Sequence, residues 1–169
     1  MESDPLGLAA GINTYLYASA SPISNIDPLG LADCSYSVST HTLMCMPNAG
    51  GTIVTLGPNG VFSGVGRCRN QDSCTNLHDL GPIPPGYYNM NPDSRPGHEH
   101  FWRLEPNPQV PGWRCMLGLN RCGFELHPGG ISLGCITTDK NDPKAMNQYS
   151  SIDALLNQEV GGNNLTVVP

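Results

Sequence analysis

The first 31 residues of the chain lack cysteine, histidine, lysine and arginine, whereas the remaining 138 residues hold all seven cysteines, all five histidines and all eight basic residues. This change of composition divides the chain into a leader, residues 1–31, and one domain, residues 32–169. The second part is close to the usual size of a single domain. It is also long enough to bury a core of its own.

Basic residues are few even in the domain. The whole chain carries a net charge of −6, and without the acidic residues of the leader 11 acidic residues face 8 basic ones. Proteins that bind nucleic acids need a basic surface to neutralise phosphates. We therefore expect no nucleic-acid partner.

Long apolar runs are also missing. No stretch approaches the about 20 apolar residues of a membrane-spanning helix, and the N-terminus lacks the basic and apolar segments of a secretory signal. Seven cysteines in so short a domain are nevertheless typical of an oxidising compartment. We expect no membrane insertion, and a carrier that brings the chain to such a compartment.

Helical periodicity is scarce, while glycine and proline are frequent, with 20 and 16 residues. A single helix is predicted over 150–160, capped by Ser150 or Ser151 and ended by Gly161 and Gly162. Short apolar runs between turn residues predict strands. They cover residues 41–46, 51–56, 60–65, 87–90, 98–106, 113–119, 123–127, 132–138 and 164–168. The predicted class is mainly β with one or two short helices.

The sequence DPLGLA occurs twice, at residues 4–9 and 27–32. Proline fixes φ and glycine permits positive φ, so each copy is a turn signal, and two unrelated turns are the simplest alternative. Residues 2–31 nevertheless resemble the end of the Rhs/YD-repeat core, whose cage ends in a DPxGL motif. The motif residues are Asp27, Pro28, Gly30 and Leu31. The resemblance implies cleavage near this motif and release of residues 32–169 as a toxin, with a parent Rhs cage, a secretion apparatus and an immunity protein as partners. Without the cage we expect residues 1–31 to be flexible.

Candidate catalytic residues concentrate in GFELHPGGISLGCITT, residues 123–138. A thiol is only slightly ionised at neutral pH, so a nucleophilic cysteine needs a base beside it. A hairpin would place His127 next to Cys135, and Ser132 could orient the imidazole. The backbone N–H groups of Gly134 and Cys135 could form an oxyanion site.

The same residues resemble the L,D-transpeptidase (YkuD-like) family, in particular its minimal branch of antibacterial effectors. The family signature is a histidine, a spacer and Ser/Thr-x-Gly-Cys, matched here by His127, Ser132, Gly134 and Cys135. GPIPPGYYNM, residues 81–90, resembles the strand entry that precedes the site. Leu133 stands where typical members have a second histidine.

The resemblance implies an L,D-transpeptidase-like β-sandwich or barrel that acts on peptidoglycan stem peptides in the periplasm of a target cell, after secretion by the producing bacterium. Cys135 would attack the carbonyl of the third stem residue and expel the terminal D-Ala. Water would then give L,D-carboxypeptidase activity, a D-amino acid would give exchange, and another stem would give L,D-transpeptidation. No cofactor or metal is implied. Candidate substrate-binding residues are Tyr88, Glu125 and Trp113.

With Cys135 set aside as nucleophile, six cysteines remain, and they permit fifteen pairings. Closeness in the sequence favours Cys68–Cys74 and Cys115–Cys122, which leaves Cys34–Cys45. Each short-loop disulfide would add on the order of 2–3 kcal/mol.

Two other classes stay open. A zinc-dependent hydrolase could use His98, Glu99 and His100 together with His127 and some of the cysteines, since strand alternation would place His98 and His100 on one face. No CxxC or HExxH spacing accompanies them. A disulfide-stapled toxin could act by binding alone, without catalysis.

Overall fold

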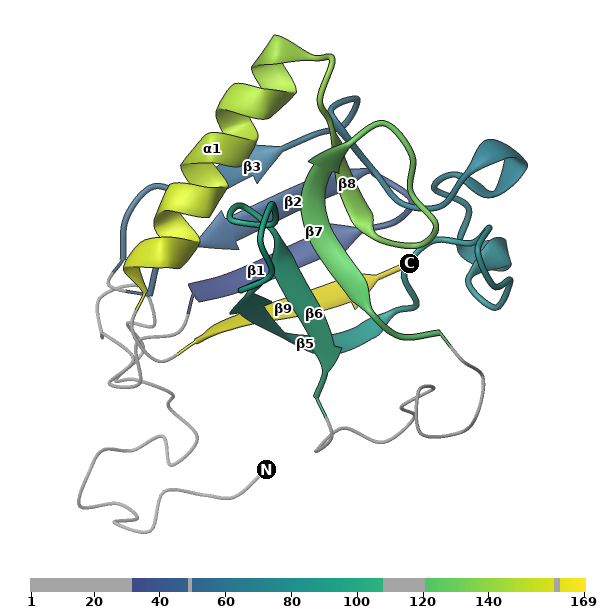
Figure 1. Ribbon diagram of the computed structural model, residues 1–169, viewed down its shortest axis with the longest axis horizontal. Helices are drawn as coiled ribbons and strands as arrows, with labels where there is room; N and C mark the ends of the chain where they lie inside the picture. Colours follow the sequence, from purple (N-terminus) through teal and green to yellow (C-terminus); the bar gives the residue numbers. More distant parts are fainter. Residues whose placement is uncertain (1–31, 49, 108–120, 160–161) are drawn as a thin grey trace, which may run out of the picture.

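The computed structural model describes residues 32–48, 50–107, 121–159 and 162–169. Strands predominate in this part of the chain (Figure 1). They are β1 (Ala32–Ser37), β2 (Thr42–Met46), β3 (Val54–Leu56), β4 (Val61–Phe62), β5 (Gly86–Pro92), β6 (Trp102–Pro106), β7 (Phe124–Gly129), β8 (Ile136–Asp139) and β9 (Asn163–Val168). The helices are α1 (Pro143–Gln158) and two short 3₁₀ helices, η3 (Gly66–Cys68) and η4 (Asp72–Cys74). The prediction of a mainly β fold is confirmed.

The described strands form one sheet, in the order β3-β2-β1-β9-β5-β6-β7-β8-β4. Strands β1 and β9 pair in parallel, as do β7 and β8, and the other neighbours are antiparallel. Helix α1 contacts β3 at one end of this order and β8 next to the other end. The sheet therefore curls into a nearly closed barrel, with α1 beside the two ends (Figure 1).

The two faces of the strands differ, as the two-residue period of a strand requires. In β7, Phe124 and Leu126 are buried in the core, while Glu125 and His127 are partly exposed on the other side. The outer face of β7 is thus left to polar side chains.

Helix α1 begins well before the predicted start at residue 150. The carboxylate of Asp142 accepts backbone N–H groups of the first turn, and Pro143 occupies the first helical position. Ser150 and Ser151 are not caps; their hydroxyls donate to backbone carbonyls one turn earlier in the same helix. Tyr149 is the first large side chain that the helix buries, so apolar periodicity does not reveal the first turn.

Two features of the sheet differ from the sequence prediction. Strand β1 was not predicted, and it pairs in parallel with β9. Strands β7 and β8 were predicted as a hairpin, but they pair in parallel, with Leu126 opposite Ile136 and Gly129 opposite Asp139. For this parallel pairing, the chain must run from Gly129, at the end of β7, back to the level of Leu126, where β8 begins. This is a distance of three residues, about 10 Å, which the loop 130–135 is long enough to cover.

Two of the predicted disulfides are present. Cys34 is joined to Cys45 between the paired strands β1 and β2, and Cys68 is joined to Cys74 between η3 and η4. Cys122 is also disulfide-bonded. Cys115 lies outside the described residues.

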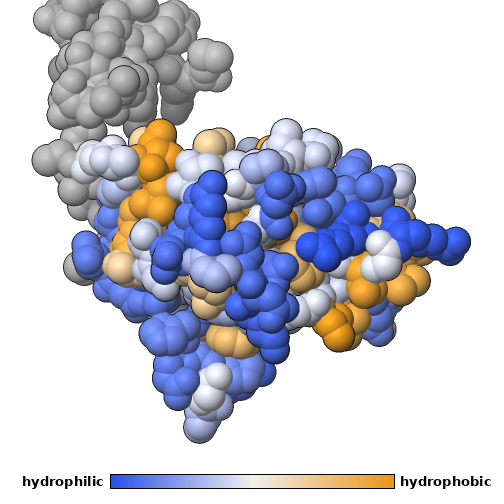
Figure 2. Space-filling model, turned by 90° about the horizontal axis from the view of Figure 1, so that it is seen from above, coloured by the Kyte–Doolittle hydropathy of each residue, from blue (hydrophilic) through white to orange (hydrophobic). Residues whose placement is uncertain are grey.

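The surface in Figure 2 is largely hydrophilic, with hydrophobic residues in separate islands. Within the described ranges, no helix combines the length and apolar character needed to cross a membrane. The leader 1–31, with Asp27, Pro28, Gly30 and Leu31, lies outside the described residues, as does the predicted strand 113–119.

Candidate active site

Cys135 immediately precedes β8, and it is the free cysteine of the described part of the chain. The next residue, Ile136, is a core residue opposite Leu126 of β7. The backbone N–H and the charge of Glu125 both act on the sulfur of Cys135, so the thiol lies beside Glu125, on the face of β7 that also carries His127. Strand spacing and rise place the Cα atoms of Cys135 and His127 about 8 Å apart, a gap that an imidazole and a thiol can span.

The environment of Cys135 keeps its thiol neutral at rest. Burial raises the pKa of the thiol above its ordinary value, and the negative charge of Glu125 raises it further. The backbone N–H groups of Glu125 and of Cys135 itself face the sulfur and lower the pKa in part. A neutral thiol needs a base to become a nucleophile.

His127 can supply that base. Its Nδ1 lies 2.9 Å from the carbonyl oxygen of Pro128. A carbonyl only accepts, so Nδ1 carries the proton and Nε2 has the free lone pair. The ring stacks on Phe101 with the centroids 4.8 Å apart. Gly129 leaves room for it, because a Cβ there would lie 3.2 Å from Cε1 of His127.

Ser132 does not orient the imidazole, contrary to the sequence prediction. Its buried hydroxyl donates to the carbonyl of Cys135 at 2.6 Å and accepts the N–H groups of Gly64 and Gly134. These three bonds use the single proton and both lone pairs of the hydroxyl. Ser63, also buried, donates to the Gly134 carbonyl. Ser132 therefore holds the loop 130–135, and through it Cys135.

Gly134 is needed for space and conformation rather than for an oxyanion site. Its φ is +127°, and a Cβ would lie 2.7 Å from Nη2 of Arg121 and 2.8 Å from the ring of Phe124. Arg121 is buried behind the loop, where its guanidinium donates to backbone carbonyls of residues 75–82. Since the N–H of Gly134 already donates to Ser132, the predicted pair of oxyanion donors is reduced to the N–H of Cys135.

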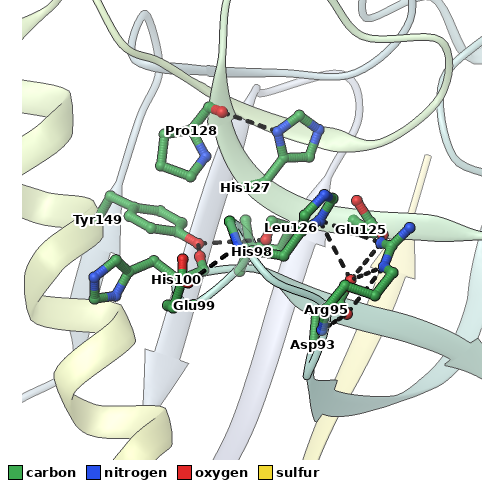
Figure 3. A network of polar contacts seen from close by, with 11 residues as sticks. Asp93, Arg95, His98, Glu99, His100, Glu125, Leu126, His127, Pro128 and Tyr149 are labelled. Atoms are coloured by element: carbon green, nitrogen blue, oxygen red, sulfur yellow. Dashed lines mark hydrogen bonds and ion pairs between the residues drawn. The ribbon is translucent and has the colours of Figure 1, made fainter.

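A charged cluster lies on the outer face of β7 (Figure 3), and one of its members, Glu125, acts on the thiol of Cys135. Arg95 pairs with Asp93 and with Glu125, and Nδ1 of His98 lies 3.4 Å from Asp93. Asp93 is buried, with 1% of its side chain exposed, and the guanidinium of Arg95 holds the pKa of that carboxyl well below its usual range. The loop 93–101 between β5 and β6 carries Asp93, Arg95 and His98, and its last residue is Phe101.

The three predicted substrate-binding residues lie in different parts of the chain, and one of them lies at the site. Tyr88 lies in the core, where its hydroxyl donates to the carbonyl of Pro84 at 2.7 Å and its ring meets Phe124 edge to face. It faces away from the outer surface because strand alternation turns the exposed Tyr87 outward instead. Glu125 lies at the site, paired with Arg95. Trp113 lies outside the described residues.

The zinc ligands considered from the sequence do not come together. Residues 97–101 form turns rather than a strand, so alternation does not apply to them. His98 faces Asp93, whereas His100 pairs with Asp153 of α1 at 2.8 Å. A different set, Asp93, His98 and Glu125, has ligand atoms within 4.8 Å of one another. Arg95 already bonds both of these carboxylates, and it supplies the positive charge that a cation would bring.

Sequence reasoning missed Asp93, Arg95, Phe101 and Ser63. The turn Asp-x-Arg was a usable local signal, because the backbone N–H of Arg95 donates to the Asp93 carboxylate at 2.9 Å. No local signal links Arg95 to Glu125, thirty residues later in the chain.

Comparisons with known proteins concern the fold and the family of the chain. Among solved structures, the helical cell shape determining protein Pgp2 (K307A mutant) from Campylobacter jejuni is similar, with 12% identity, a TM-score of 0.51, and coverage of 88% of this chain and 52% of that one. LD transpeptidase LdtMt1 in complex with imipenem has 15% identity, a TM-score of 0.40 and coverage of 81% and 58%. The L,D-transpeptidase from Mycobacterium smegmatis has 13% identity, a TM-score of 0.41 and coverage of 82% and 58%.

The chain thus spans between half and three fifths of the length of these structures. No curated protein matches the sequence. The sequence model of the Tlde1 domain matches residues 57–164, which include the loop 93–101, His127 and Cys135. The chain therefore belongs to the Tlde1 domain family, a family of type VI secretion effectors with an L,D-transpeptidase-like fold.

Proposed function

We propose that this chain is an antibacterial effector that cleaves or exchanges the terminal D-Ala of tetrapeptide stems in peptidoglycan, with Cys135 as the nucleophile. One observation carries the proposal: a thiol outside any disulfide lies on the same outer sheet face as an imidazole whose Nε2 is free to accept a proton. Membership of the Tlde1 domain family supports a peptidoglycan substrate.

In the first half of the reaction, Nε2 of His127 takes the thiol proton as Sγ of Cys135 attacks the carbonyl carbon of the third stem residue. The S–C bond forms and the carbonyl oxygen becomes an oxyanion, which the N–H of Cys135 stabilises. The tetrahedral intermediate then breaks its C–N bond. His127 returns the proton to the departing amine of D-Ala, and a thioester remains on Cys135.

In the second half, His127 takes a proton from the acceptor and gives it to the departing thiolate. Water as acceptor yields a tripeptide stem, a free D-amino acid yields an exchanged tetrapeptide, and the amine of another stem yields a cross-link. Hydrolysis and cross-linking consume the tetrapeptide, and exchange replaces its terminal D-Ala, so each outcome alters a stem that the target cell uses for its own cross-linking.

Delivery and location follow from the same proposal. Disulfides such as Cys34–Cys45 and Cys68–Cys74 persist in an oxidising space, which the periplasm of a target cell provides together with the substrate. The DPLGL motif at residues 27–31 suits release from an Rhs cage, and a producing cell that makes such a toxin needs an immunity protein.

The test is digestion of purified tetrapeptide muropeptides, with mass spectrometry of the products. We expect loss of D-Ala, or its exchange when a D-amino acid is added. Cys135→Ala and Cys135→Ser should abolish turnover, whereas Ser151→Ala, on the exposed side of α1, should not change it.

The same variants distinguish a toxin that acts as an enzyme from a toxin that acts by binding alone. Directed to the periplasm of a sensitive cell, the Cys135→Ala variant should be harmless. Retained toxicity of that variant, or intact substrate with the wild-type protein, contradicts the proposal; the first outcome favours a toxin that acts by binding.

A further inference from the structure

The guanidinium of Arg95 is fixed on one edge and open on the other. Nε and Nη2 donate to Asp93, and Nη2 also donates to Glu125. Within the described part of the chain no hydrogen bond leaves Nη1, so two of the five N–H groups remain for a ligand. The Arg95 side chain is 56% exposed, although the Asp93 carboxylate that anchors it is almost fully buried.

This cation lies beside the reacting groups. Glu125, which Arg95 contacts, has its backbone N–H directed at the sulfur of Cys135. His127 lies two residues further along β7 on the same face. Figure 3 shows Arg95 between Asp93 and Glu125, on the loop that reaches across to β7.

The charged neighbours of Arg95 are paired within the cluster. The negative charges of Asp93 and Glu125 are engaged on the anchored edge of the guanidinium. Arg103 stands opposite Glu125 in the register of β6 and β7, and its guanidinium pairs with Glu105 at 2.7 Å. An exposed, pre-oriented guanidinium edge is a typical binding site for a carboxylate.

We propose that Arg95 binds the C-terminal carboxylate of the stem peptide, so that the enzyme selects stems in which a single residue with a free carboxylate follows the scissile bond. This inference rests on the proposed function. The carboxylate of the leaving D-Ala is one residue, about 3.5 Å of chain, beyond the carbonyl that Cys135 attacks. Arg95 contacts the side chain of Glu125, and the backbone N–H of Glu125 faces the sulfur of Cys135. Arg95 is therefore close enough to Cys135 to meet a carboxylate one residue beyond the scissile carbonyl.

The predicted consequence is a preference for tetrapeptide stems. A pentapeptide carries its free carboxylate one residue further from the scissile carbonyl, and a stem amidated at its C-terminus carries none. Both should be poor substrates, because the first misplaces the anion and the second leaves Nη1 without its charged partner.

The experiment measures kcat/KM for a soluble tetrapeptide stem and for the same peptide with a C-terminal amide. The proteins are the wild type, Arg95→Gln, Arg95→Lys and the control Arg67→Gln, which removes an exposed arginine of η3. We expect the wild type to prefer the free acid roughly tenfold or more, the range of a charge-assisted hydrogen bond. The preference should fall toward one in Arg95→Gln, take an intermediate value in Arg95→Lys and keep its wild-type value in Arg67→Gln.

The outcomes are distinct. If the wild type cleaves neither peptide, the proposed function fails. If the wild type cleaves both peptides and the acid-to-amide ratio is the same in wild type and Arg95→Gln, the inference about Arg95 is overturned while the proposed function stands. An equal loss of rate on both peptides in a folded Arg95→Gln protein also overturns it, because that result assigns Arg95 a structural role.

Discussion

The loop 130–135 and the loop 93–101 both border the outer face of β7, and they are held there by different interactions. Neutral hydrogen bonds to the backbone hold the first loop, through the buried hydroxyls of Ser132 and Ser63. Ion pairs and ring stacking hold the second, through the half-exposed Arg95 and the ring of Phe101.

The difference separates two tasks. A loop with saturated, buried hydrogen bonds keeps Cys135 in one place, because any shift leaves polar groups unpaired away from water. A loop held by partly exposed charges responds to salt, to pH and to a charged ligand. The proposed nucleophile, Cys135, thus lies on the rigid side, and the candidate recognition residue, Arg95, lies on the side that a substrate can influence.

Among the variants that compare the two loops, Gly134→Ala, in the loop 130–135, is expected to have the largest effect. A Cβ at this position would meet Arg121 and Phe124 at less than 3.0 Å, and the positive φ adds strain. Moving Cys135 by about 1 Å would lower activity on the order of a hundredfold. Steady-state kinetics on tetrapeptide stems measures this loss, and activity within twofold of the wild type would show that the loop is not fixed.

The second largest effect is expected from Gly129→Ala, which displaces the proposed base, His127. Gly129→Ala would place a Cβ 3.0 Å from Thr137 and 3.2 Å from the imidazole of His127, so the ring must turn. We expect a loss of activity of about tenfold or more. Gly130→Ala is the matched control, since the nearest atom to its Cβ would be Cε of Lys140 at an ordinary 3.8 Å. Equal kinetics for the two variants would contradict the assignment of His127.

The free energy of unfolding of Ser132→Ala tests the neutral hydrogen bonds that hold the loop 130–135. The substitution leaves the Cys135 carbonyl and the N–H groups of Gly64 and Gly134 without their partner, at a cost of about 1–3 kcal/mol in the free energy of unfolding. Urea denaturation should give the same loss between pH 4 and pH 7, because the hydroxyl does not titrate in this range. A loss that changes with pH would assign the loop to the charged network.

The smallest effect is expected from Arg95→Gln on stability, and it should depend on pH. Arg95 lowers the pKa of Asp93, so the pair stabilises the folded state above the ordinary Asp pKa of about 3.9 and loses this contribution as the pH falls. The difference between wild type and Arg95→Gln should therefore shrink from pH 6 to pH 3 in urea denaturation. A difference that is constant or grows in acid has the wrong sign for this pair.

What the sequence could predict lies within short stretches of chain. The alternation around Phe124 and Leu126 indicates a strand with His127 on its polar side. Cysteine spacing indicates the Cys68–Cys74 disulfide and leaves Cys34–Cys45 as a remaining pair. The thiol and the imidazole lie only eight residues apart, so a local pattern was sufficient to pick them out.

The remaining features depend on tertiary contacts. The parallel pairing of β7 and β8 depends on where the rest of the sheet places them, and a hairpin was the simpler local prediction. The hydroxyl of Ser132 accepts a hydrogen bond from Gly64, in a distant segment of the chain. This bond helps to occupy the acceptor positions that the sequence prediction had assigned to His127. The pair Arg95–Glu125 joins residues thirty positions apart, and neither has a pattern that identifies the other.

The proposed reaction requires that the sulfur of Cys135 becomes covalently bonded to the stem peptide. Intact-protein mass spectrometry after rapid acid quenching of the reaction with tetrapeptide stems tests it most directly. We predict a mass increase equal to the mass of the tetrapeptide stem minus the mass of free D-Ala. Proteolysis should locate this adduct on the peptide that contains Cys135, and the adduct should be missing in His127→Ala. Turnover of the stem by the Cys135→Ala protein, or an adduct on another residue, would contradict this account.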